Sequence, residues 1–147
     1  MPDLSASSRS AHQVVAERYP FGVFTGEHTV AAAREAAELV RYLNIATLDR
    51  SGEALPDPNT AAAVLGALNT ACDWLPQLLA QLLQRMHDFA GDPDLATGSS
   101  TDTASALAAR AMAHLGLAQD ALSPLARELR AAFAAADRLY LDTDDED

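Results

Sequence analysis

Eleven apolar residues near the end of the chain follow one another at alternating intervals of four and three. These intervals place side chains on one face of an α-helix. The series continues without a phase change through Ser123-Pro124, where a new helix would be expected to break it. It therefore predicts one continuous helix, capped by Thr101 or Asp102, bent at Pro124 and ending near Leu141. The alanine-rich seam of this helix is Ala104, Ala108, Ala111, Leu115, Ala118, Leu122, Leu125, Leu129, Ala132, Ala136 and Leu139.

A second long amphipathic stretch precedes it, from Asp57 to Gly91. Asp57 before Pro58 predicts an N-cap with proline at the first helical position, and Gly91 predicts the end of the helix. The apolar arc is wider than the seam of a two-stranded coiled coil, so we expect the helix to contact at least two neighbours. We expect Pro76 to bend it. Its main apolar row is Val64, Leu68, Ala71, Leu75, Leu78, Leu82 and Phe89, and its second row is Leu65, Cys72, Leu79 and Met86.

A shorter amphipathic stretch, from Thr25 to about Asp49, completes the predicted fold. The loop after Gly91 is short enough to make the two long helices antiparallel neighbours. The sequence therefore predicts an all-α fold: an elongated antiparallel bundle of three main helices, a long helical hairpin plus the shorter N-terminal helix. Residues 1–24 would form a mobile arm with a possible short helix from His12, residues 25–141 a single domain, and residues 142–147 an acidic disordered tail.

The charge of the chain argues against several classes of partner. Ten arginines and no lysine face 21 acidic residues, and the formal net charge is −11. Direct binding to nucleic-acid phosphates or to anionic lipid is therefore unlikely, because both require a cationic surface. The single cysteine, Cys72, cannot form an internal disulfide, and we expect it to be a buried thiol. We see no conventional signal peptide and no membrane span, so the expected location is the cytoplasm.

Residues with catalytic or ligating potential are scattered along the chain. Nucleophile motifs, phosphate-binding glycine loops and Cys-x-x-Cys pairs are missing from the sequence, and no histidine stands in a Glu-x-x-His arrangement. We therefore predict no catalytic residue, no metal site and no cofactor, and we do not expect the protein to be an enzyme.

Four aromatic residues are the candidates for a partner interface. Trp74 lies at the border between the apolar arc and the polar stripe of its helix, where it covers a neighbouring helix or anchors an interface. Phe21 and Phe24 follow Pro20 in a segment that cannot be regular helix, and they either close the end of the bundle or dock a partner. Tyr140 follows the last predicted helix.

Two resemblances bear on source and function. Glu38–Asn44, Val64–Leu68 and Leu75–Leu79 resemble a group of small, uncharacterised alanine-rich helical proteins from actinomycete, streptomycete-like genomes, which often accompany plasmid or conjugative-element genes. Separately, Tyr140-x-x-x-Asp144 resembles the C-terminal export signal of type VII secretion substrates, which are small helical hairpins. Those substrates carry Trp-x-Gly in the turn between their helices, whereas the only tryptophan here, Trp74, lies within a predicted helix.

These observations lead to two functional hypotheses. The first is a non-enzymatic helical interaction or scaffold protein that self-associates, for example as a homodimer, or docks a protein partner, as an accessory protein of a mobile genetic element. The alternative is a type VII secreted helical-hairpin substrate or its partner, exported without a conventional signal peptide. Part of the hairpin's apolar arc extends beyond the shorter helix, so either the N-terminal arm or a second copy would have to cover it.

Overall fold

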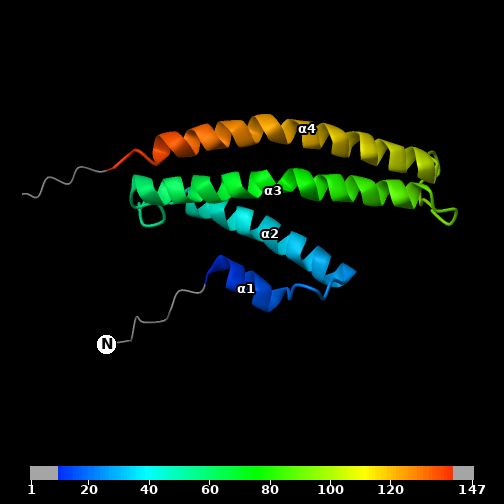
Figure 1. The fold of residues 1–147 in the computed structure, drawn as a ribbon, viewed down its shortest axis with the longest axis horizontal. Coiled ribbons are helices and arrows are strands. Elements are labelled where there is room, and N and C mark those ends of the chain that lie inside the picture. The colour runs from blue at the N-terminus through cyan, green and yellow to red at the C-terminus, as the bar shows by residue number, and fades with distance from the viewer. Residues whose placement is uncertain (1–9, 141–147) are drawn as a thin grey trace, which may run out of the picture. The chain divides into compact units, whose positions relative to one another are not determined.

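The computed structural model describes residues 10–140, and these residues form four α-helices and no strand (Figure 1). The helices are α1 (Ala11–Arg18), α2 (Gly26–Ala46), α3 (Pro58–Ala90) and α4 (Ala104–Ala136). The all-α prediction is confirmed for this part of the chain. The helix count is four rather than three main helices, because a segment of the predicted N-terminal arm forms α1.

The chain divides into two compact units, Met1–Ala54 and Leu55–Asp147. The first unit contains α1 and α2, and the second contains α3 and α4. The predicted boundaries after residues 24 and 141 stay predictions, and the predicted acidic tail, residues 142–147, lies outside the described residues.

Helix α3 begins and ends where the sequence predicts. The side chain of Asp57 accepts a hydrogen bond from the Thr60 backbone N–H at 2.8 Å, Pro58 opens the helix, and Gly91 follows its last residue. Gly91 is in the right-handed region, at φ −85°, so this helix ends without the left-handed cap that glycine often provides. Pro76 lies inside a continuous helix, as predicted.

Helix α4 is also continuous through its proline, but its ends differ from the prediction. Its N-cap is Thr103, whose hydroxyl accepts from the Ala106 N–H at 3.2 Å. Thr101 and Asp102 are therefore not the cap. Asp102 instead accepts from Arg110 at 2.7 Å. The helix ends at Ala136, several residues before the predicted end near Leu141.

Helices α3 and α4 lie side by side and antiparallel, joined by residues 91–103 (Figure 1). Two contacts fix which residues lie level with each other. A Cβ placed on Gly66 would stand 3.2 Å from the Phe133 ring, and Arg130 donates to Asp73 at 2.9 Å. Leu78 is therefore level with Leu122, and Leu82 with Ala118.

The residues of α4 that face α3 differ from the predicted seam in its second half. Ala118, Leu125, Ala132 and Leu139 are exposed, whereas the residue after each of the first three is half-buried. From Met112 onward the half-buried residues again alternate by three and four, so the heptad spacing is kept and only its phase differs from the predicted seam. The facing series of α4 is Ala104, Ala108, Met112, Leu115, Gln119, Leu122, Ala126, Leu129, Phe133 and Ala136.

On α3, the predicted second row is the one that packs against α4. Cys72 is buried, as predicted, and Leu65, Leu79 and Met86 are half-buried. In the predicted main row, Val64, Leu68 and Leu75 are also half-buried, whereas Ala71, Leu78, Leu82 and Phe89 are exposed. The facing series of α3 is Ala62, Leu65, Asn69, Cys72, Pro76, Leu79, Leu83, Met86 and Ala90.

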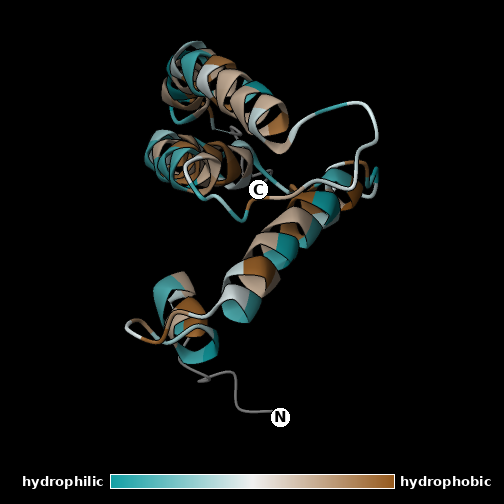
Figure 2. Ribbon diagram, turned by 90° about the vertical axis from the view of Figure 1, so that its right-hand side faces the viewer, coloured by the Kyte–Doolittle hydropathy of each residue, from teal (hydrophilic) through white to brown (hydrophobic). Residues whose placement is uncertain are grey.

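In the first unit, α1 is attached to α2 by an exposed ion pair. Thr25 caps α2 as predicted, and Ser10 and Gln13 form a capping box at the start of α1. The Nε of Arg18 donates to both carboxylate oxygens of Glu35 at 2.8 Å. This guanidinium holds the pKa of the Glu35 carboxyl below its ordinary value. Figure 2 shows hydrophobic and hydrophilic segments alternating along α2, as in an amphipathic helix.

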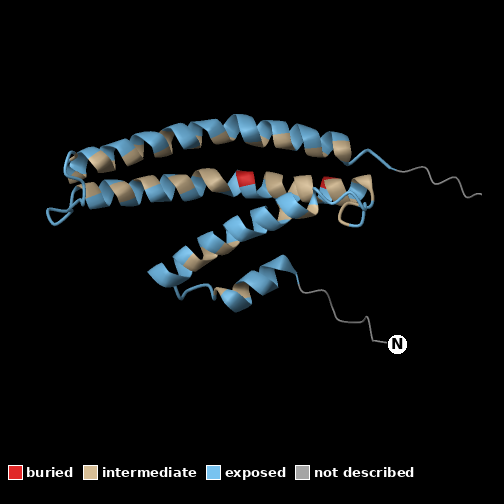
Figure 3. Ribbon diagram, turned by 180° about the vertical axis from the view of Figure 1, so that it is seen from behind, coloured by how far each residue is buried: buried red, intermediate tan, exposed pale blue. Residues whose placement is uncertain are grey.

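Very little of the described chain is buried. Only Ala62 and Cys72, both on α3, are buried among residues 10–140 (Figure 3). Large apolar side chains that would normally fill a core remain partly or largely exposed. Because exposed apolar area costs free energy that burial would recover, the uncovered surface is where function should be sought.

Candidate interaction surface

The two sides of the α3–α4 hairpin can be told apart by one contact. Asp73 follows the buried Cys72, Arg130 follows the half-buried Leu129, and the two side chains bond to each other at 2.9 Å. Residues one position after the facing residues therefore lie on the same side of the hairpin on both helices. Since the helices are antiparallel, residues one position before the facing residues share the opposite side.

The side that contains Asp73 and Arg130 is polar. We call it the polar face. Its exposed members can hydrogen-bond to water. The ion pair at its centre is itself largely exposed, so we expect that pair to add less than about 1 kcal/mol to the free energy of unfolding. The polar face comprises Thr70, Asp73, Gln77 and Gln84 of α3 and Asp120, Ser123, Arg127 and Arg130 of α4.

The opposite side is almost free of charge, and we call it the apolar face. Its α3 residues are large, and its α4 residues are mostly alanine. The only charged residues among them are Arg85, which pairs with Asp88 and lies over the Phe89 ring, and Glu128, which pairs with Arg127. The apolar face comprises Val64, Leu68, Ala71, Leu75, Leu78, Leu82 and Phe89 of α3 and Leu107, Ala111, His114, Ala118, Ala121, Leu125 and Ala132 of α4.

Trp74 borders this face on the side of α3 that points away from α4. Its side chain is 73% exposed, and it stands one helical turn before Leu78, itself 49% exposed. Leu82 follows one turn later and is 44% exposed. Trp74, Leu78 and Leu82 therefore form one continuous exposed apolar strip along α3.

The other predicted interface residues lie elsewhere. Phe21 and Phe24 are in the connection between α1 and α2, and both are exposed. The Phe21 ring stacks on His12 with ring centroids 5.8 Å apart. Tyr140 is exposed beyond the end of α4, far along the hairpin from Trp74. The four residues form no single cluster within either unit, and Asp144 lies outside the described residues.

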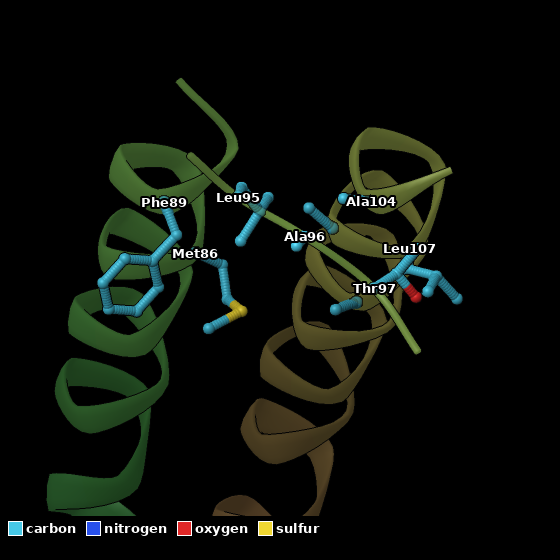
Figure 4. Close-up of a pocket in the computed structure, with 9 residues that line it drawn as sticks. Met86, Phe89, Leu95, Ala96, Thr97, Ala104 and Leu107 are labelled. Carbon is cyan, nitrogen blue, oxygen red and sulfur yellow. The ribbon is translucent and has the colours of Figure 1, made fainter. Parts of the chain in front are cut away.

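The apolar face continues into a hollow at the closed end of the hairpin (Figure 4). Its volume is about 280 Å³, and Met86 and Phe89 of α3, Leu95 of the loop and Leu107 of α4 line it. The sequence predicts only a short connecting loop here and does not predict the hollow. The signal that could have found it is Leu95, the one large apolar side chain among the polar residues of the loop.

A second hollow lies in the first unit, between α1 and α2. Its volume is about 460 Å³, and its walls include Val15, Arg18, Glu35 and Leu39. The acid and the base that could bind a charged ligand there are already bonded to each other. This hollow therefore resembles an incompletely filled contact between two helices more than a ligand site.

Metal-ligand clusters and membrane-spanning helices are two features that the described residues do not contain. Among residues 10–140, no three His, Cys, Asp or Glu side chains come together as metal ligands would. In the same range, no helix is long and apolar enough to cross a bilayer. What this arrangement can do chemically is bury apolar side chains against another protein surface.

Comparisons of the chain with protein-family models, with curated proteins and with solved structures find no significant match. The geometry of the apolar face is therefore the basis for proposing a function.

Proposed function

We propose that this protein is a non-enzymatic helical interaction or scaffold protein that acts by burying the apolar face of its hairpin, through self-association or by docking a protein partner. The observation that carries the proposal is the contrast between the two faces of one hairpin. One face is polar and contains the Asp73–Arg130 ion pair, while the other presents Leu78, Leu82 and Phe89 to solvent. Exposed contiguous apolar surface rimmed by polar residues marks interaction sites.

We further propose that α2 is the third helix of an antiparallel bundle and covers the part of the apolar face nearest the start of α3. The support is that α2 carries its own apolar seam, which includes Ala36, Leu39 and Leu43, and that Leu39 is largely exposed within the first unit. Trp74 would then anchor the border of the surface that remains. The resemblance to proteins that accompany plasmid genes favours a cytoplasmic accessory role in a mobile genetic element.

The test compares two charge substitutions on the same helix. Leu82→Asp puts a charge on the apolar face, and Gln84→Asp puts the same charge on the polar face. We expect the wild type and Gln84→Asp to self-associate, or to enrich the same protein from the native cell, and Leu82→Asp to lose that association. Mass spectrometry of affinity-purified protein and sedimentation velocity measure the two forms of association. Equal behaviour of all three proteins in both measurements would overturn the proposal.

Export by a type VII system is a second candidate, and one observation favours it. Tyr140 is exposed a few residues after the second helix of an antiparallel helical hairpin, the position that the export signal occupies in the substrates it resembles. We expect a tagged protein to enter the culture supernatant of a host with such a system and Tyr140→Ala to abolish this. A tagged protein found only in the cell lysate would refute this candidate.

A further inference from the structure

We infer that the occupant of the apolar face at the closed end of the hairpin is the same end of a second copy, arranged as a four-helix bundle about a two-fold axis parallel to the helices. This inference rests on the proposed function and names its partner. The segment concerned runs from Leu78 to Phe89 on α3 and from Leu107 to Ala121 on α4.

If α2 packs along the start of α3 as proposed, its length would leave this end of the hairpin uncovered. Its 21 residues measure about 32 Å, whereas the 33 residues of α3 measure about 50 Å. Residues 47–57 connect α2 to the start of α3, so α2 folded back along α3 would reach no further than about Leu78. The exposed Leu82 and Phe89 lie beyond that point.

Charge favours a copy of the same chain over a charged partner. In a two-fold interface the same patch meets itself, so an unbalanced charge on the patch would face its own copy across the axis. The chain carries a net charge of −11, yet this segment of the apolar face holds no acidic residue and only Arg85, which Asp88 already pairs. A basic partner would find no acidic residue on this surface to pair with.

The shape of the face is self-complementary. Large side chains form a ridge on α3 (Leu78, Leu82, Phe89), and α4 presents mostly small ones (Ala111, Ala118, Ala121), with His114 between the first two. A two-fold axis parallel to the helices places α4 of the second copy over α3 at the same level. The large side chains of α3 in each copy then contact the small side chains of α4 in the other copy.

The contacts within one hairpin predict the contacts between copies. Asp73 opposite Arg130 and Gly66 opposite Phe133 place Leu82 level with Ala118 and Phe89 level with Ala111. In the dimer, Leu82 therefore packs on Ala118 of the second copy, and Phe89 on Ala111 of the second copy. The arrangement makes all neighbouring helices antiparallel, which is the usual order of a four-helix bundle.

Disulfide trapping tests this pairing. In a Cys72→Ala background, Leu82→Cys and Ala118→Cys are made as separate proteins, and Gln84→Cys on the polar face is the control. We expect mild oxidation of mixed Leu82→Cys and Ala118→Cys proteins to give a covalent dimer in high yield. Neither protein alone should do so, nor should a mixture of Gln84→Cys with Ala118→Cys. Efficient cross-linking of Leu82→Cys with itself would overturn the arrangement, because it would place α3 against α3.

Sedimentation velocity supplies the second measurement. Only about nine residues of each copy lie on this segment of the apolar face, fewer than the roughly 20–30 per partner of standard complexes, so we expect micromolar association. The full chain should change from monomer to dimer between about 1 and 100 µM, and Leu82→Asp should weaken the dimer at least about tenfold while Gln84→Asp does not. Circular dichroism checks that both variants stay helical.

The outcomes separate this inference from the proposed function. A wild type that stays monomeric over the whole range overturns the second copy as occupant. If the same protein then enriches a partner that Leu82→Asp loses, the proposed function stands and only the inference fails. A dimer that Leu82→Asp leaves intact also overturns the inference, because it would use another surface.

Discussion

At the scale of single residues, the two glycines inside the long helices make a matched pair. A Cβ on Gly116 of α4 would meet nothing within 4 Å, whereas one on Gly66 of α3 would stand 3.2 Å from the Phe133 ring. We predict that Gly116→Ala raises the free energy of unfolding by up to about 1 kcal/mol, through helix propensity alone. Gly66→Ala should gain much less, because Phe133 must move to make room.

A double-mutant cycle checks the cause of that difference. In a Phe133→Ala background, Gly66→Ala should show the same gain as Gly116→Ala, measured by urea unfolding. A full gain from Gly66→Ala in the wild type would contradict the packing of Phe133 on Gly66, and with it one of the two contacts that set the helix register.

Gly66 and Phe133 also show why the seam of α4 could be only partly predicted. Ala118 and Ala132 fit a buried seam by sequence alone, but alanine is accepted on either face of a helix. The pattern therefore leaves the rotation of α4 free within about one residue. The structure rotates the helix so that Phe133, which fits over Gly66, packs in place of Ala132. Only knowledge of the facing helix could have shown this.

At the scale of elements, the N-cap of a helix can be predicted where the sequence offers one capping residue. It is missed where several capping residues follow one another. Asp57-Pro58 offers one clear start for α3, and the structure uses it. Before α4 the sequence reads Thr101-Asp102-Thr103, three good capping residues in a row. Asp102 bonds to Arg110, and the Thr103 hydroxyl accepts from the Ala106 N–H.

The corrected cap gives a prediction for α4. Thr103→Ala should lower the free energy of unfolding by about 1 kcal/mol, because the Ala106 N–H loses its acceptor. Thr101→Ala is the control and should change it by less than about 0.5 kcal/mol, since Thr101 is an exposed loop residue. The comparison is made by thermal or urea unfolding of the full chain. Equal losses from both substitutions would mean that the helix begins earlier than Thr103.

At the scale of the whole molecule, the sequence indicates that the helix of residues 57–91 has a second apolar contact, but not which of its rows stays exposed. The wide apolar arc of 57–91 indicated a second contact for this helix, and exposed Trp74 lies beside it. Which apolar row would face α4 could not be read from the sequence, because both rows have helical spacing and similar side chains. The packing of α4 on the row that contains Cys72 left the row with Leu78 and Leu82 outside.

The net charge of −11 leads to a prediction about the association of two copies. Two chains of the same sign repel each other, while the apolar contacts proposed between them carry almost no charge. Raising sodium chloride from 0.1 to 1 M shortens the screening length from about 10 Å to about 3 Å. We therefore predict that the dimer becomes several-fold tighter at high salt, as measured by sedimentation equilibrium.

A truncated chain separates this charge effect from a general effect of salt on apolar surfaces. Residues 142–147 hold five of the acidic residues, so their removal changes the net charge from −11 to −6. At 0.1 M salt the truncated chain should associate more tightly than the full chain, and its association should respond less to added sodium chloride. An association held by ion pairs would behave in the opposite way, because salt would weaken it. Weakening of the full-length dimer at 1 M salt would therefore show that charged groups, and not the Leu82 ridge, hold the copies together.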